Sequence, residues 1–219
     1  MNPATDLIES QALAPSIKVL LLLTLLALLP ALILTATSFV RTVVVLSFLR
    51  IGLGAAQTPP NQVIIGIALF LSFFTMSPVI GEMKAAGYEP YRRAEITELQ
   101  ALERASIPLK RFMLRQTREE DLRLFQGAAN APLPPSPDEV ALHVALPAFA
   151  ISELTTAFQM GVIILLPFLV VDLAVASLLM SMGMIMVPPA TLSLPIKLLL
   201  FVLVDGWNLV TGSILRSFL

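Results

Sequence analysis

The stretch Val19–Leu34 reads VLLLLTLLALLPALIL and contains no charged residue. An α-helix rises 1.5 Å per residue, so about 20 apolar residues cross a hydrocarbon core of ~30 Å. The uncharged segment 19–40 has this length. We interpret it as a helix of the mature protein and not as a signal peptide, because the first 16 residues carry Asp6 and Glu9 but no basic residue.

Further apolar runs predict an all-α membrane protein with about four kinked apolar helices arranged in hairpins. A double proline, Pro59-Pro60, marks the expected start of the second helix. The predicted helices lie near 17–40, 61–80, 154–180 and 192–215. Seven prolines fall in or beside them and predict kinks or breaks, which are tolerated at membrane depth where protein buries them. These are Pro30, Pro78, Pro147, Pro167, Pro188, Pro189 and Pro195.

Charge divides the chain into three segments. Of the 219 residues 57% are apolar and 13% are charged, and most of the charges fall between residues 81 and 142. We expect an N-terminal apolar helical hairpin (1–80), a polar helical segment (81–142) and a C-terminal apolar hairpin with a gate loop (143–219). This pattern excludes an ordinary soluble enzyme and a disordered protein. The net charge of −1 argues against a nucleic-acid partner.

The polar segment is predicted to form short helices outside the cytoplasm. Arg41 and Arg50 place their connection on the cytoplasmic side by the positive-inside rule, so the segment falls on the periplasmic side. Ser106–Pro108 resembles a helix start, and Thr117–Glu120 has the spacing of a capping box. The proline-rich stretch 132–137 is expected to be a linker.

No group of residues with enzymatic spacing is found in the sequence. His143 is the only histidine and has no cysteine to pair with, since the chain contains none. The pattern Gly52-Leu53-Gly54 is half of a phosphate-binding motif and does not follow a predicted strand. We therefore predict a protein that is not an enzyme and that binds no cofactor or metal.

Five charged residues interrupt apolar sequence, where an unpaired charge is costly. They are Arg41, Glu153, Asp172, Lys197 and Asp205. Lys197 and Asp205 are eight residues apart, about 80° around a helix, so they do not pair with each other. Each needs a partner on another helix or subunit, and we predict intersubunit polar contacts. A proton or ion pathway through Asp172, Lys197 and Asp205 is the alternative.

Methionines recur at every second position from Met180 to Met186 and lead into Pro188-Pro189. Gly183 and the two prolines predict a loop or extended chain from Gly183 onward. Methionine is flexible and polarisable, so a loop of this kind could seal a pore. Met184, Ile185 and Met186 are therefore candidate gate residues. Pro188 and Pro189 are candidate helix breakers at the gate. The alternative is that these methionines fill the core at the end of a helix.

Several stretches together resemble one family, FliP/SctR, over nearly the whole chain from about residue 17. Its flagellar branch serves flagellar biosynthesis, and its injectisome branch serves type III secretion. The matching stretches are FVRT (39–42), PPNQV (59–63), FMLRQTR (112–118), LPAF (146–149), SEL (152–154), TAFQ (156–159), PFL (167–169), DL (172–173), MIMVPPA (184–190) and LVDGW (203–207). The stretches 112–118 and 205–207 favour the flagellar branch. The family has three methionines before the double proline, and here the middle one is Ile185.

The resemblance implies a core pore-forming subunit of the type III export gate in the bacterial inner membrane and flagellar basal body. Family members form a homo-pentamer that joins the FliQ and FliR proteins, with an FlhB-type export protein as a further partner. The resulting conduit carries unfolded export substrates, its helices bend into hairpins, and the polar segment packs between neighbouring subunits. An injectisome homologue, an ion-coupled transporter and a basal-body scaffold remain alternatives.

Overall fold

The computed structural model describes residues 15–55, 58–129, 140–184 and 186–219, and these residues form helices without a strand. The expected all-α architecture is confirmed. The helices are α2 (Pro15–Thr35), α3 (Phe39–Leu53), α4 (Asn61–Met83), a π-helical turn η1 (Lys84–Tyr88), α5 (Glu89–Arg92), α6 (Glu98–Gln116), α7 (Glu119–Ala128), α8 (Leu142–Ser181), α9 (Pro189–Leu203) and α10 (Gly206–Arg216).

Four apolar stretches have the length and composition of membrane spans, in two different forms. The helices Asn61–Arg92 and Leu142–Ser181 are continuous and each long enough to cross a bilayer. The other two stretches are helix pairs, α2 with α3 and α9 with α10, bent by 64° and 66°. The bends within these two pairs fall at residues 36–38 and 204–205 and not at the prolines expected to kink the chain. Five of those prolines lie inside helices: Pro30, Pro78, Pro147, Pro167 and Pro195. Helix α8, with 40 residues, starts well before the expected residue 154.

The break between α2 and α3 corrects the single helix expected over 17–40, and helix α3 stands where a connection carrying Arg41 and Arg50 was expected. At this break, side-chain hydroxyl groups hydrogen-bond to backbone carbonyls. The Thr35 hydroxyl donates to the carbonyl of Ala31 at 2.8 Å, and the Thr37 hydroxyl donates to that of Leu34 at 3.1 Å. The next residue, Ser38, is buried and hydrogen-bonds Ser72 of α4 at 3.0 Å. Local side-chain bonding of this kind competes with helix continuation, which explains the turn.

The break between α9 and α10 corrects the single helix expected over 192–215. Asp205 has a left-handed backbone (φ 51°), a conformation that aspartate tolerates better than most residues. Gly206 follows so close to Phe201 that a Cβ atom there would lie 2.2 Å from the ring. Phe201 and Trp207 meet edge to face at 5.4 Å between ring centroids. The corner is therefore a packed structure.

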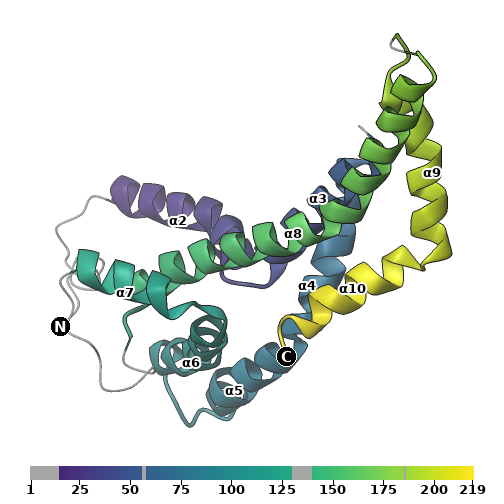
Figure 1. Cartoon of the computed structure of the whole chain (residues 1–219). Coiled ribbons are helices and arrows are strands. Elements are labelled where there is room, and N and C mark those ends of the chain that lie inside the picture. Colours follow the sequence, from purple (N-terminus) through teal and green to yellow (C-terminus); the bar gives the residue numbers. More distant parts are fainter. Residues whose placement is uncertain (1–14, 56–57, 130–139, 185) are drawn as a thin grey trace.

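Helix α8 is the element on which the others are arranged (Figure 1). Helix α3 lies along it, and α9 returns beside its far end to form a hairpin, while α10 turns back towards the middle of the molecule. Helices α5, α6 and α7 gather at the opposite end, where α7 packs on the start of α8. Helix α2 stands apart and packs chiefly against α3.

The core lies where α3 crosses α8, and small residues make that crossing close. A Cβ atom on Gly161 of α8 would lie 2.4 Å from the ring of Phe48, and one on Gly52 of α3 would lie 2.5 Å from Phe168. Small residues let apolar helices approach closely, which favours dispersion contacts. The buried side chains around the crossing include Val45, Leu46, Leu49, Leu53, Ile64, Ala68, Ala157, Phe168, Phe201, Val210 and Ile214.

The polar segment is helical, as predicted, but its helix starts differ. Thr97 caps α6 in a reciprocal capping box with Gln100, so Ser106 and Pro108 lie inside a helix that begins earlier than expected. Helix α7 starts at Glu119, yet the Thr117 hydroxyl donates to the carbonyl of Met113 in α6 and does not cap α7. The expected linker at 132–137 lies outside the described residues, as do Asp6 and Glu9, on which the signal-peptide argument rests.

Candidate functional site

Arg41 and Glu153, which the sequence singled out separately, form one buried ion pair between α3 and α8. Their side chains are 2% and 0% exposed. The Arg41 Nε donates to Glu153 Oε2 at 2.9 Å and Nη2 donates to Oε1, so the contact is bidentate. A bidentate arginine–carboxylate pair fixes the relative position of the two helices as well as neutralising both charges.

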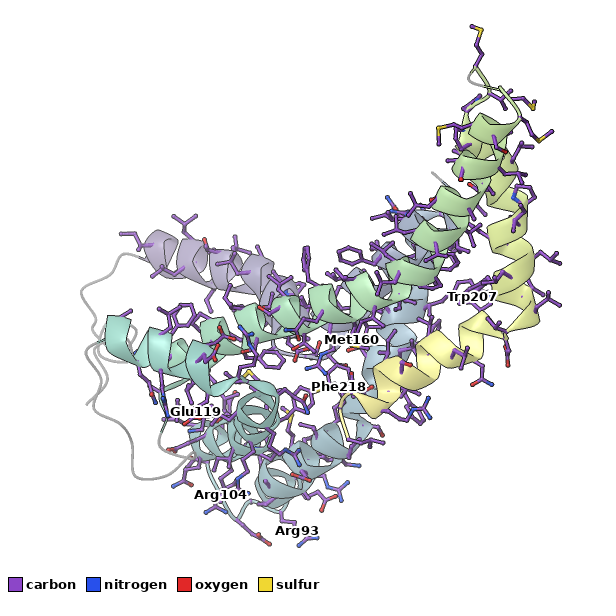
Figure 2. All side chains as sticks on the ribbon, viewed as in Figure 1. Arg93, Arg104, Glu119, Met160, Trp207 and Phe218 are labelled. Carbon is purple, nitrogen blue, oxygen red and sulfur yellow. The ribbon has the colours of Figure 1, made fainter. Side chains whose placement is uncertain are left out.

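The Arg41 guanidinium also binds the C-terminal turn and the end of α6. Its Nη1 donates to the carbonyl and hydroxyl of Ser217 at 2.8 and 3.0 Å, and Nη2 donates to Gln116 Oε1 at 3.1 Å. The guanidinium carbon lies 4.0 Å from the ring centroid of Phe218, which Figure 2 shows beneath the middle of α8. This arginine therefore connects four parts of the chain and acts structurally.

A second polar cluster joins α7 to α8, and the sequence analysis missed it. Arg118 Nε donates to Asp121 Oδ2 at 2.8 Å, while the hydroxyl of the fully buried Ser152 donates to the same oxygen at 2.6 Å. The hydrogen bond from Arg118 holds the pKa of Asp121 below its ordinary value of 3.8, although burial acts in the opposite direction. The only available signal was the Arg118–Asp121 spacing at i, i+3.

Asp172 and Lys197 form the ion pair that ties α9 to α8. Lys197 Nζ donates to Asp172 Oδ2 at 2.6 Å, and Ser193 Oγ donates to the other carboxylate oxygen at 2.6 Å. Lys197 is 5% exposed and Asp172 is 37% exposed. Lys197 thus has a partner on another helix of the same chain, which is one of the two options that the sequence left open; an intersubunit contact of Lys197 stays a prediction.

Asp205 is set apart from this pair. It precedes the first residue of α10, makes no capping hydrogen bond through its side chain, and is exposed. In the part of the chain that the structure describes, no contact joins it to Lys197 or Asp172, in agreement with the spacing argument. The three residues proposed as an ion pathway therefore separate into a pair and one exposed carboxylate.

The α8–α9 hairpin ends in a methionine-rich tip, defined here as residues 180–186. Helix α8 ends at Ser181, Gly183 turns the chain with φ 75°, and α9 begins after Pro188, so the predicted loop is confirmed for the described residues. Met180, Met182, Met184 and Met186 are 65%, 65%, 41% and 97% exposed. Ile185 lies outside the described residues. Figure 2 shows the sulfur atoms projecting around this end of the molecule.

Three features describe what the arrangement can do chemically. The buried polar side-chain atoms of the described residues all have hydrogen-bond partners, and no three acidic or histidine side chains among them form a metal-binding group. His143 is exposed at the start of α8, away from the ion pairs. The feature that distinguishes this arrangement is the methionine-rich tip, which carries flexible apolar side chains. It lies at the end of the α8–α9 hairpin, whose two helices the Asp172–Lys197 ion pair holds together.

Comparison with known proteins gives a consistent result. A family model described as "FliP family" matches residues 22–214. The chain is 53% identical to the flagellar biosynthetic protein FliP of Pectobacterium carotovorum subsp. carotovorum, over 93% of this chain and 79% of that protein. It is 47% identical to the protein of that name from Bacillus subtilis (strain 168), over 96% and 95% of the two chains. The Aquifex aeolicus (strain VF5) protein of the same name is 48% identical, over 94% and 87%.

Proposed function

The chain belongs to the FliP family, and from this premise we propose that it is a core pore-forming subunit of the flagellar type III protein export apparatus. In this role it conducts unfolded flagellar proteins across the bacterial inner membrane. The relatives carry flagellar names, which supports the flagellar branch over an injectisome role. The three segments 1–80, 81–142 and 143–219 then serve as an outer hairpin, a periplasmic segment and a gate hairpin.

The methionine-rich tip is the observation that carries the proposal. Several copies of the tip around one axis would bring flexible apolar side chains together at a constriction. Such a ring excludes water and ions by dewetting. Unbranched thioethers change rotamer at little cost, so the ring also yields to side chains of many shapes as an unfolded chain passes.

Self-association follows from the apolar surface that one chain leaves uncovered. Exposed aromatic side chains line α4, including Phe70, Phe73 and Phe74. Patches of this kind mark contacts with protein or lipid. We infer that they are covered by further copies, in the pentamer that the family resemblance implies, and by the FliQ and FliR proteins. Helix α2, which is apolar on all sides, lies against lipid.

The polar segment supports the same assembly. A groove of about 640 Å³ runs between α5 and α6, lined by Tyr88, Tyr91, Leu99 and Leu102 among others. These side chains are exposed although the surrounding segment is polar. We propose a second copy of this chain as the occupant, in continuity with the self-association of the apolar helices. Leu102→Asp should lower the oligomeric mass in detergent, whereas Arg104→Asp, on the same helix, should leave it unchanged.

The gate is tested by the double variant Met184→Ala/Met186→Ala. We expect the complex to assemble but to leak small ions, with export reduced modestly or conditionally, because the alanine side chains are too short to close the constriction. Conductance of membranes containing the complex is the measurement. Val170→Ala, which removes an exposed apolar side chain from α8 away from the tip, is the control. A double variant that assembles and remains as tight as the parent would contradict the gate.

The orientation in the membrane is tested separately with single cysteines, since the natural chain has none. The Arg104→Cys variant places a thiol at an exposed position of α6. The Ser181→Cys variant places one at an exposed position of the methionine-rich tip. A membrane-impermeant thiol reagent added to cells with a permeable outer membrane should label the first and spare the second. The reverse pattern would overturn a periplasmic polar segment.

A further inference from the structure

We propose that the methionine-rich tip is a site of reversible oxidation, at which peroxide or hypohalous acid converts thioethers to sulfoxides. Four of the nine methionines in the chain fall within these seven residues. Methionine oxidation by small oxidants depends on access to the sulfur atom. The four side chains are 41–97% exposed, whereas Met76 and Met113 in the core are 4% and 0% exposed.

The local geometry favours this chemistry at the tip. No heavy atom outside the turn lies within 4 Å of a Cβ built on Gly183, so the centre of the tip is open. The chain has no cysteine, so no thiol of this protein competes for the oxidant. Hydrogen peroxide is only slightly larger than water, so it can reach sulfur atoms as exposed as those of the tip.

The reaction needs no group beyond the oxidant. The thioether sulfur attacks one oxygen of a hydroperoxide, the O–O bond breaks, and an S=O bond forms. The sulfur loses two electrons, and the peroxide takes them up and leaves as water or an alcohol. A dithiol reductant reverses the step, removing the oxygen as water while its two thiols become a disulfide.

The consequence of oxidation for transport rests on the proposed function. A sulfoxide is polar and accepts hydrogen bonds, so it holds water where a thioether repels it. A ring of sulfoxides at a constriction would favour wetting, and the closed gate would then conduct ions. The tip would in this way couple export and membrane tightness to oxidative stress.

The site is tested on the full-length protein in its native membranes. After treatment with hydrogen peroxide, peptide mass spectrometry measures the rate of oxygen addition at each methionine. We expect Met184 and Met186 to be oxidised at least about tenfold faster than Met113, and methionine sulfoxide reductase to restore them. Equal rates at the tip and at Met113 would overturn the site, as would oxidation that the reductase does not reverse.

The effect on the seal is tested with a variant in which Met180, Met182, Met184 and Met186 are all replaced by leucine, which keeps apolar side chains of similar volume and leaves no thioether at the tip to oxidise. Peroxide should raise ion conductance in the parent protein and leave this variant unchanged. An equal rise in both would overturn the proposed effect on the seal. The conductance of the Met184→Ala/Met186→Ala variant without oxidant tests whether the tip is a gate. The oxidation proposal can therefore fail while the gate proposal holds, and the reverse result is equally distinguishable.

Discussion

The two halves of α8 differ in how much of their surface the chain itself covers. In residues 142–161 the buried positions are Val144, Ala145, Ala148, Phe149, Ser152, Glu153, Ala157 and Gly161, whereas in residues 162–181 they are Phe168 and Leu179. The less buried half is the more apolar by composition, since 16 of the 20 residues at 162–181 are apolar against 12 of the 20 at 142–161. Burial in the first half is thus provided within one chain, and the second half presents its apolar surface to other molecules.

The ion pairs follow the same division. Glu153 in the first half is fully enclosed, and its partner Arg41 also binds two other parts of the chain, the C-terminal turn and the end of α6. Asp172 in the second half is partly open and binds only the neighbouring helix α9. One helix therefore combines a half that is held by buried contacts within the chain, the rigid half, with a half whose apolar surface the chain leaves uncovered, the open half.

The largest expected effect is on the rigid half. Glu153→Ala leaves the Arg41 guanidinium buried without its carboxylate, which should lower the free energy of unfolding by about 3–5 kcal/mol. Thermal unfolding in detergent and the amount of protein in membranes measure this loss. Arg41→Met combined with Glu153→Leu removes both charges and should recover most of the stability. A single variant as stable as the parent would show that the halves do not differ in this way.

A smaller effect is expected where α3 crosses the end of the rigid half. Gly161→Ala places a Cβ atom 2.4 Å from the Phe48 ring, and relieving this overlap should cost about 1–3 kcal/mol of unfolding free energy. Gly66→Ala in α4 is the matched control, because no heavy atom lies within 4 Å of the added methyl group. Unfolding midpoints of the two variants should move in opposite directions, since alanine otherwise favours a helix.

In the open half, replacing Asp172 and replacing Lys197 should lower the free energy of unfolding by unequal amounts. Asp172→Ala leaves Lys197 buried and unpaired, which should cost about 1–2 kcal/mol. Lys197→Ala leaves Asp172, which is partly exposed and keeps Ser193, and should cost about 1 kcal/mol or less. Denaturation in detergent measures the unfolding free energies of the two variants. The reverse order would indicate that the open half is enclosed within the single chain after all.

The smallest expected effect is on how the free energy of unfolding depends on pH, through Asp121, which lies beside the rigid half. The pKa of Asp121 is lower in the folded protein than its ordinary value, because Arg118 stabilises the carboxylate. The unfolded chain therefore binds a proton more readily. The contribution of Asp121 is present above pH 3.8 and is lost as pH falls through the folded pKa. Asp121→Asn should flatten the acid limb of the stability profile; an unchanged limb would remove Asp121 from that role.

The sequence predicted four apolar helical stretches and their approximate positions, because hydropathy is a local property, but it did not predict that two of them are bent helix pairs. It also identified Arg41, Glu153, Asp172 and Lys197 as needing partners. It did not pair them, since Arg41 and Glu153 are 112 residues apart and meet only through the crossing of α3 with α8. The Asp121 cluster was missed because its partner Ser152 carries no charge and is fully buried.

The breaks in the first and last apolar stretches were beyond a hydropathy argument for a related reason. A window of apolar residues measures composition, and the turn at Asp205 depends on one backbone angle. The methionine-rich tip was predicted as a loop because a glycine and two prolines mark it directly. Features set by a few residues close in sequence were thus accessible, and those set by tertiary contact were not.

The corner at Asp205 also bears on how this subunit fits bilayers of different thickness. Helices α9 and α10 have 15 and 11 residues, so placed in line they would extend roughly 39 Å. Bent by 66°, the pair reaches roughly 33 Å from end to end, close to the ~30 Å of a typical hydrocarbon core. A long apolar stretch usually relieves such hydrophobic mismatch by tilting. Here the corner between α9 and α10 shortens the reach of the pair, which brings its length close to that thickness without a tilt.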